Sequence, residues 1–422
     1  MSSIRHILMA LASVVAMIAT SAGALADVIK LKDGRTLTGE IIREVDGYIW
    51  IKHSTGGIEA TDLVRPDEVD SIERDAGAAP VSAEPVRAKE PTSTPRRTPG
   101  VPRAAVISLG EGGDKDMVGV YMTAESLRRL IPILEQDQID IVVFKINSGG
   151  GLLLEIQRLS DVIQNEFKPK FQVVAWIESA ISAAAMTAHC IEDIYFMPEG
   201  NYGACTGWSG QLVAVKGRGL EEVLYKMELI SARGRHAKEI MRSMQIDEPL
   251  SATFTPDGDV KWYNTEEGEY LVNPKGRILT FNANDAVKYH FAKGVAKTYQ
   301  ELGRAMGYRE VDWVGKIVPG VPYPICRAEE EMQSFRNQTY QDQVRTNEYF
   351  VSYQSSVEAA RGEQDRKQRG AMVNRARQAL RRIERMVANN PNFALLTFNM
   401  PDYETFKDWV RQQDEFLDSL MK

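Results

Sequence analysis

The sequence predicts an α/β core that is preceded by a small all-β unit and followed by an α-helical region. Two β-branched apolar runs near the middle of the chain, 139–144 and 171–176, have the composition of buried strands. Each run leads through a turn of small residues into a segment with helical spacing, the alternation that characterises α/β proteins. Short segments of alternating polarity precede this region, and a polar, helix-forming stretch follows it.

Length and composition limit the function classes. A chain of 422 residues is too long for one typical domain, so we expect two or three units. The net charge of −7 argues against nucleic acid as a partner, because phosphate binding needs a basic surface. Cys190, Cys205 and Cys326 supply neither a disulfide framework nor a zinc site. Buried thiols are the favoured interpretation, with a Cys190–Cys205 bridge as the alternative in an oxidising compartment.

Residues 1–26 have the features of a secretory signal peptide. A positively charged start is followed by an apolar stretch at 7–18 and by small residues at 24–26, as at a cleavage site. An uncleaved N-terminal anchor is the alternative. No later segment has the run of about 18 apolar residues that spans a bilayer. We therefore expect an exported protein, periplasmic or extracellular and mostly soluble.

Residues 27–75 alternate in polarity like short antiparallel strands. Asp-Gly pairs at 33–34 and 46–47 are strong hairpin signals between them. Such a unit could close into a small barrel of the Sm-like or SH3-like type and serve in interaction or oligomerisation. Residues 76–103 are rich in proline and alanine and have no apolar periodicity, so we expect a linker.

Residues 104–318 are expected to form the α/β domain. Thr123 is the candidate N-cap of its first helix, and Pro132 is expected to kink that helix in its last turn. The remaining elements follow from local patterns. They are strands at 105–109, 139–144, 171–176 and 194–197, helices at 123–134, 152–167, 219–244 and 284–305, and a β-hairpin insertion at 260–281.

Residues 319–422 are expected to be helical. Ala376, Leu380, Ile383 and Val387 recur at helical spacing, which predicts an apolar stripe. Arginines crowd the same segment, at positions 375, 377, 381, 382 and 385. A solvated helix face is the simpler interpretation, and an acidic partner or a lipid surface is the alternative. The aromatic residues between 393 and 409 are expected to pack on a helix or on a neighbouring subunit.

Ser182 follows the strand at 171–176 and opens a helix of very small side chains. A hydroxyl at the first turn of a helix lies in the field of unpaired amide hydrogens, which suits a nucleophile and the oxyanion it generates. The alternative is an ordinary serine N-cap. About thirty residues earlier, the glycine turn Gly149, Gly150 and Gly151 ends the neighbouring strand, and its backbone can approach a ligand closely.

These two stretches carry a resemblance to a known family. Residues 146–151 resemble the Ile-Asn-Ser-Pro-Gly-Gly signature of the Clp protease proteolytic subunit, with Gly149 in place of proline. Residues 181–184 are similar to the Ala-Ser-Ala-Gly nucleophile segment of membrane-associated serine proteases of the NfeD and signal-peptide-peptidase A type. The similarity covers roughly residues 104–300. It implies the ClpP/crotonase superfold, a spiral of strand–strand–helix turns.

The resemblance implies Ser182 as a nucleophile, which needs a base to take its proton. The Clp subunit has a histidine about twenty-five residues after its serine, but no histidine lies near position 207 here. His189 is two helical turns from Ser182, about 10 Å away, and is expected to be a core or subunit-contact residue. The NfeD-type proteins use lysine. The position of that lysine in the NfeD pattern falls one residue from Lys216 of this chain, and Lys226 is the alternative base.

The amides of Gly150 and Ala183 are the implied oxyanion donors, and Gly150 with Gly151 would let an extended substrate pair as an added strand. The resulting hypothesis is an exported, ATP-independent serine peptidase with a Ser182–Lys216 dyad. It would cleave peptides or membrane-protein fragments, form a homo-oligomer and need no metal or organic cofactor, and peripheral membrane association is compatible with it. The alternative is a catalytically inactive scaffold that binds envelope partners through its barrel and helical tail. A crotonase-like acyl-CoA enzyme is disfavoured by the export signal.

Overall fold

The computed structural model describes residues 27–32, 36–45, 48–55, 58–64, 69–73, 98–209, 213–214 and 216–422. The chain divides into two compact units, Met1–Ser93 and Thr94–Lys422, and each is described by itself. The predicted signal peptide at 1–26 and most of the predicted linker at 76–103 lie outside the described residues.

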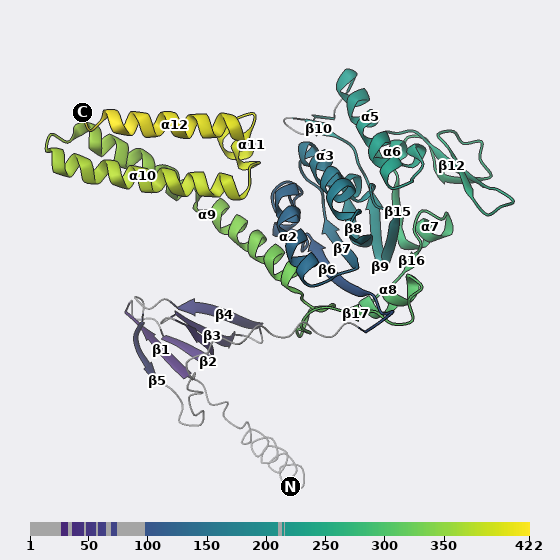
Figure 1. The fold of residues 1–422 in the computed structure, drawn as a ribbon, viewed down its shortest axis with the longest axis horizontal. Coiled ribbons are helices and arrows are strands. Elements are labelled where there is room, and N and C mark those ends of the chain that lie inside the picture. Colours follow the sequence, from purple (N-terminus) through teal and green to yellow (C-terminus); the bar gives the residue numbers. More distant parts are fainter. Residues whose placement is uncertain are drawn as a thin grey trace, which may run out of the picture. The chain divides into compact units, whose positions relative to one another are not determined.

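The N-terminal unit is an antiparallel sheet (Figure 1). Its strands, in the order β4-β3-β2-β1-β5, are β1 (Asp27–Leu31), β2 (Thr36–Val45), β3 (Tyr48–Thr55), β4 (Ile58–Val64) and β5 (Val69–Glu73). Its buried core consists of Ile29, Leu31, Ile49, Ile51 and Val64. The predicted small all-β unit is confirmed, whereas its closure into an Sm-like or SH3-like barrel stays a prediction. Both expected Asp-Gly turns fall outside the described residues.

The second unit is built on a mainly parallel sheet. Its central strands β6 (Arg103–Leu109), β7 (Ile141–Ser148), β8 (Gln172–Ile181) and β9 (Asp193–Gly203) are parallel neighbours in chain order. β15 (Thr280–Asn282) pairs antiparallel with β9, while β16 (Gly294–Val295) and β17 (Asp312–Trp313) add parallel to β9 and β6. Alternate residues of β7 enter separate cores on the two faces, as the period of a strand requires.

Helices connect the parallel strands and cover one face of the sheet (Figure 1). α2 (Ala124–Gln136) follows the short 3₁₀ turn η1 (Gly113–Lys115), α3 (Leu153–Val162) continues as the π-helical segment η2 (Ile163–Phe167), and α4 (Ala183–Ala188) leads from β8 to β9. Thr123 caps α2 as predicted, in a reciprocal capping box with Ser126, and Pro132 lies inside that helix. The predicted fold class, α/β with an N-terminal antiparallel sheet and C-terminal helices, is confirmed.

Two of the predicted helices are each divided in the structure. The expected helix at 219–244 forms α5 (Arg218–Arg233) and α6 (Lys238–Gln245), because the chain turns at Gly234 and at Arg235, whose φ is 57°. The expected helix at 284–305 forms α7 (Ala283–Lys288) and α8 (Tyr299–Ala305), with β16 between them. His290, whose φ is 56°, lies just after the end of α7 and interrupts the helical conformation there.

The expected hairpin insertion begins earlier than the sequence suggested. β12 (Leu250–Phe254) lies between β13 (Val260–Tyr263) and β14 (Tyr270–Asn273), and both pairs are antiparallel. β10 (Trp208–Ser209) and β11 (Val213–Ala214) form a further antiparallel pair. All three cysteines are free and buried, so the thiol interpretation is confirmed and the Cys190–Cys205 bridge is absent.

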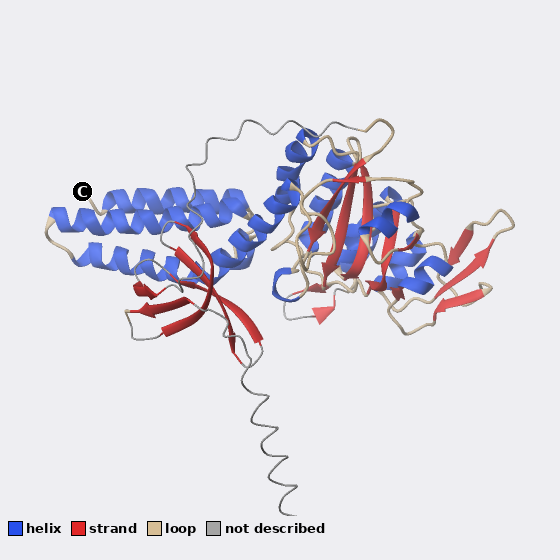
Figure 2. Cartoon of the chain, turned by 90° about the horizontal axis from the view of Figure 1, so that it is seen from below, coloured by secondary structure: helices blue, strands red, loops and turns tan. Residues whose placement is uncertain are grey.

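The C-terminal residues form helices that lie side by side (Figure 2). They are α9 (Arg327–Gly362), α10 (Arg366–Asn389), α11 (Phe393–Phe398) and α12 (Tyr403–Ser419). α10 packs against α9 and α12 and buries the predicted stripe of Ala376, Leu380, Ile383 and Val387. None of the helices in the described part of the chain is both long enough and apolar enough to cross a bilayer.

The aromatic tail packs on helices of its own chain. Phe398 lies 5.0 Å from Phe350 of α9 and 5.0 Å from Phe406 of α12, measured between ring centroids. Trp409 completes the cluster at 5.6 Å from Phe398. Of the two packing modes expected from the sequence, the structure therefore contains the contact with a helix.

The arginines of α10 divide into paired and unpaired groups. Arg377 forms ion pairs with Asp414 and Asp418 of α12, and Arg381 lies 3.7 Å from Glu384. The exposed Arg375, Arg382 and Arg385 have no ion-pair partner among the described residues. A groove of about 520 Å³ follows this face, lined by Asn374, Arg377, Gln378, Arg381, Arg382 and Arg385.

A buried ion pair fixes the start of α9 to strand β6. The Glu329 carboxylate and the Arg336 guanidinium are both fully buried and lie 3.4 Å apart. Between them, Ser108 donates its backbone N–H to Glu329 at 2.8 Å, and its carbonyl accepts from Arg336 at 2.8 Å. A buried charge that loses its partner is strongly destabilising, so we expect this network to be essential for the attachment of α9.

Replacement of Glu329 tests this attachment. Glu329→Ala should lower the free energy of unfolding by about 3–5 kcal/mol, because it removes the only fully buried carboxylate partner that the described residues give the Arg336 guanidinium and leaves the half-exposed Glu111, at 3.0 Å, as its remaining ion pair. Glu330→Ala is the matched control. Glu330 is the next residue, is exposed, and pairs at 3.7 Å with the exposed Lys316, so its loss should change the same quantity by less than about 1 kcal/mol. Guanidinium denaturation followed by far-ultraviolet circular dichroism measures both. Equal effects would contradict the assignment.

Candidate active site

Ser182 lies at the junction of β8 and α4 in a strained backbone conformation. Its φ of 55° and ψ of −125° fall in a region that residues with side chains rarely adopt. Such strain costs about 1–3 kcal/mol and persists where the surroundings fix the backbone. Here the Ser182 N–H donates to the Gly203 carbonyl at 2.9 Å, and its carbonyl accepts from Met186 at 3.0 Å. A strained serine at a strand-to-helix turn is the geometry that presents the nucleophile in α/β-hydrolases.

The Ser182 hydroxyl does not cap the helix that follows it. An N-cap serine normally accepts a hydrogen bond from an amide of the first helical turn. Ser182 has no such bond, and Oγ has no hydrogen-bond partner among the described residues. The side chain is half-buried. The residue therefore occupies the N-cap position without performing its usual structural role.

The glycine turn and Ser182 are in contact. Gly150 has a φ of 113°, and a Cβ built on it would lie 2.7 Å from Cβ and 3.1 Å from Oγ of Ser182. The absence of a side chain at Gly150 thus permits this approach. Ala183 is the first residue of α4, so its N–H has no acceptor within the helix. Ser182, Gly150 and Ala183, which the resemblance linked, are neighbours in the structure.

The amides of the glycine turn are engaged by the protein itself. The Gly149 N–H donates to Oδ2 of Asp116 at 2.9 Å, and the Gly150 N–H donates to Oγ of Ser148 at 3.1 Å. The Ser148 hydroxyl in turn donates to the Asp116 carbonyl. The Gly150 amide must therefore be shared with Ser148, or released by it, to bind an oxyanion. Glycine at 149 adds an N–H that proline would lack, and Asp116 accepts it. Sequence reasoning noted the substitution but missed this acceptor.

One edge of the glycine turn is also paired. Val118 donates its N–H to the Gly150 carbonyl at 2.8 Å and accepts from the Leu152 N–H at 3.0 Å, which makes a parallel bridge with Gly151. In a parallel bridge the central residue directs its own N–H and C=O to the opposite side. An added substrate strand would therefore have to pair at that opposite edge of Gly151.

The structure does not bring a candidate lysine to Ser182 by any described contact. Lys216 and Lys226 are both exposed, and neither has a hydrogen bond or ion pair with a described residue. Residues 210–212 and 215, which flank Lys216, lie outside the described part of the chain. Burial lowers the pKa of Lys168, but its amine donates to the Arg233 carbonyl at 2.8 Å and interacts with Cys190, which lies beyond the far end of α4 from Ser182.

His189 is a core residue, as expected. It is fully buried, its Nδ1 lies 3.0 Å from the Tyr202 hydroxyl, and its Nε2 has no partner among the described residues. Its ring centroid is 4.6 Å from that of His236, whose Nε2 lies 2.8 Å from the Ile191 carbonyl. Burial lowers the pKa of His189 well below its usual value and, as the largest of several causes, lowers the pKa of His236 to about 4.

This histidine pair predicts acid sensitivity. The folded state keeps both rings neutral, whereas the unfolded chain binds protons below a pKa of about 6.5. Their contribution to stability is therefore complete above pH 6.5 or so and is lost as the pH falls towards 4, on the order of 3 kcal/mol for His236 alone. The denaturation midpoint should therefore decrease as the pH is lowered from 7.5 to 5. In His236→Gln this decrease should be smaller. His290→Asn, at an exposed histidine, is the control, and it should leave the pH dependence of the midpoint as it is in the wild type.

The strain at Ser182 is testable by a pair of substitutions. Ser182→Gly should relieve the backbone strain while Ser182→Ala keeps it, so the glycine variant should be more stable by about 1–2 kcal/mol. At Ser355, exposed and two turns before the end of α9, the order should reverse by about 1 kcal/mol, because glycine is the poorer helix former. Chemical denaturation of the four variants measures both differences. The same order at both sites would rule out strain at Ser182.

Comparisons with known proteins agree with the motif-based resemblance. No protein-family profile matches the chain. Over 188 residues, 44% of this chain and 38% of the relative, it is 27% identical to membrane protein NfeD1b of Bacillus subtilis (strain 168). The match thus spans less than half the length of that relative. The resemblance to the NfeD type that the motifs predicted is confirmed for this part of the chain.

Solved structures with some similarity include two proteases. A mutant of the 1510-N membrane-bound stomatin-specific protease is 17% identical, with a TM-score of 0.36, over 54% of this chain and 93% of that one. A ClpP1 mutant from Listeria monocytogenes is 15% identical, with a TM-score of 0.30, over 47% of this chain and 94% of that one.

Proposed function

We propose that this chain, which is similar to NfeD1b over 188 residues, is an ATP-independent serine peptidase with Ser182 as its nucleophile. The observation that carries the proposal is the strained Ser182 backbone, which presents an uncapped hydroxyl against Gly150. An ordinary N-cap serine would gain nothing from such strain. Peptides or membrane-protein fragments are the proposed substrates, and export to the periplasm or the extracellular space is part of the same proposal.

The proposed reaction begins with attack of Oγ of Ser182 on the scissile carbonyl carbon, while the amine of Lys216 takes the hydroxyl proton. The oxyanion that forms accepts hydrogen bonds from the amides of Ala183 and Gly150. Collapse breaks the C–N bond, and the Lys216 ammonium returns the proton to the leaving amine. Water, deprotonated by the same lysine, then hydrolyses the acyl-enzyme. For this role the exposed Lys216 must move to Ser182 and lose its hydration, since burial is what lowers the pKa of a lysine.

Assembly would supply that dehydration. We include in the proposal a homo-oligomer in which a second copy covers the segment around Lys216, and a peripheral contact of the unpaired α10 arginines with an anionic membrane surface. Sedimentation velocity and co-sedimentation with vesicles of anionic phospholipid test these two parts. A monomer at all concentrations would refute the homo-oligomer. A protein that does not sediment with the vesicles would refute the membrane contact.

The alternative is an inactive scaffold, and specific contacts favour it. The Gly150 amide donates to Ser148, and the Gly149 amide donates to Asp116, so the glycine turn is satisfied without a substrate. Lys216 and Lys226 are exposed. A scaffold would bind envelope partners through its N-terminal sheet and its C-terminal helices. It would retain the fold and the Ser182 turn without turnover.

Hydrolysis by matched variants separates the two functions. Cleavage of casein or a fluorogenic peptide library by residues 27–422 should fall about a thousandfold or more in Ser182→Ala, because the nucleophile is lost. Lys216→Ala should have a comparable effect, whereas Lys226→Ala, an exposed lysine on α5, should leave kcat/KM unchanged. Loss in Lys226→Ala instead of Lys216→Ala would move the base to Lys226. Turnover that survives Ser182→Ala, or no turnover in any protein, would refute the peptidase.

A further inference from the structure

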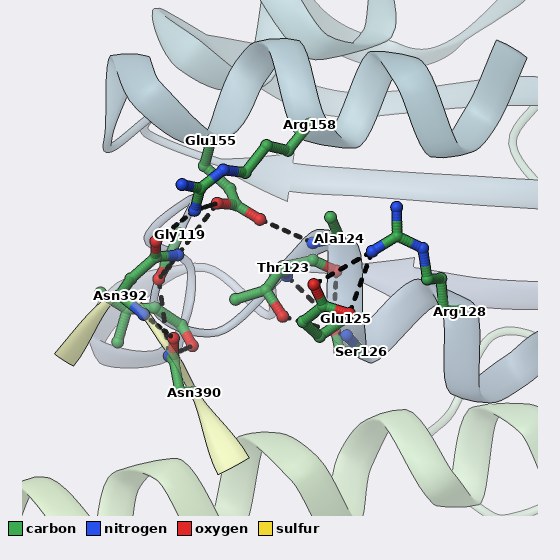
Figure 3. Close-up of polar contacts among 11 residues, drawn as sticks. Gly119, Thr123, Ala124, Glu125, Ser126, Arg128, Glu155, Arg158, Asn390 and Asn392 are labelled. Carbon is green, nitrogen blue, oxygen red and sulfur yellow. Dashed lines mark hydrogen bonds and ion pairs between the residues drawn. The ribbon is translucent and has the colours of Figure 1, made fainter. Parts of the chain in front are cut away.

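The turn between α10 and α11 is joined by buried hydrogen bonds to the segment that precedes α2 (Figure 3). Asn390 is fully buried and donates through Nδ2 to the Val120 carbonyl at 2.8 Å. Asn392, also buried, donates through Nδ2 to the Gly119 carbonyl at 2.9 Å. We call these two residues the asparagine clasp. It joins the C-terminal helices to a segment some 270 residues earlier in the chain.

The clasp is completed by a buried carboxylate. Glu155, in the first turn of α3, is 2% exposed. One of its oxygens accepts the Ala124 N–H at the start of α2, at 2.6 Å, and the other accepts Nδ2 of Asn392 at 3.0 Å (Figure 3). Arg158 lies 3.5 Å from the same carboxylate. Because a buried charge needs each of its partners, Glu155 ties the α10–α11 turn to the beginnings of α2 and α3.

The segment that the clasp holds is the one that pairs with the glycine turn. Val118 bonds the backbone on either side of Gly151, as described above. Gly119 fits against the next residue of the turn, since a Cβ there would lie 2.7 Å from a methyl of Leu152. Val118 and Val120 are both buried. The contacts therefore run without a break from Asn392 through Gly119 and Val118 to Gly150, which touches Ser182.

We propose that the asparagine clasp makes the C-terminal helices a positioning element for the glycine turn, so that these helices control the reactivity of Ser182. The inference rests on the proposed peptidase function. Asn392 acts through Gly119 and Val118, and Asn390 acts through Val120, so both are positioning residues that do not touch substrate. A displacement of the α10–α11 turn releases segment 118–120, and the glycine turn loses the partner that fixes one edge.

The test uses the full chain and two readouts. The first is amide hydrogen exchange of peptides that cover 117–124 and 149–155. The second is the rate at which a fluorophosphonate probe labels Ser182, with Ser182→Ala as the blank. Asn392→Ala should speed exchange in both segments by about tenfold or more and slow the labelling by a similar factor, because two hydrogen bonds to segment 118–120 and Glu155 are lost. Asn392→Ser replaces it if the alanine variant does not fold.

Asn389→Ala is the matched control. Asn389 precedes the clasp and bonds Arg129 of α2 through Oδ1 at 2.9 Å, so its loss disturbs the same turn without touching segment 118–120. It should leave exchange in both segments and the labelling rate unchanged. A folded Asn392 variant with wild-type exchange in 149–155 overturns the inference. If Asn392→Ala speeds exchange but even the wild type is never labelled, the positioning contact stands and the peptidase function is refuted. Failure of the inference and failure of the proposed function can therefore be told apart.

Discussion

The candidate site depends on the contact between Gly150 and Ser182, which exists because nothing larger than hydrogen stands on Gly150. The contact follows from the register of the sheet. β7 and β8 are parallel neighbours, and Ser148 lies opposite Ala180 at their carboxyl ends. Both strands therefore end at the same edge of the sheet, which is where open α/β sheets bind their ligands. The Gly203 carbonyl at the end of β9 then fixes the Ser182 amide in its unusual conformation.

Much of the fold was predictable because it follows from local patterns. The central strands, the N-cap at Thr123 and the apolar stripe of α10 each depend on residues close in sequence, and the structure contains them all. The helix breaks were missed for a physical reason. Arg235 and His290 adopt positive φ values that their residue types do not indicate, since tertiary contacts rather than local propensity impose them.

The site was less predictable, because its contacts are distant in sequence or depend on burial. The family resemblance linked Ser182 with the glycine turn, but it could not show that Asp116 accepts the extra amide of Gly149. Glu155 resembles any acidic residue in a first helical turn, and its burial is caused by a segment far along the chain. The resemblance to the NfeD type implied Lys216 without indicating whether its amine is dehydrated.

The long-range contacts constrain the order in which the molecule can form. Val120 and Asn390 are separated by 270 residues, and closing a loop of that size is entropically unfavourable until many contacts form together. Synthesis also proceeds from the N-terminus, so the strands that carry Ser182 exist long before α10 has been made. The turn beside Ser182 thus gains its last supports only after the α10–α11 turn has been synthesised, so the nascent chain holds Ser182 in an incompletely supported turn until then.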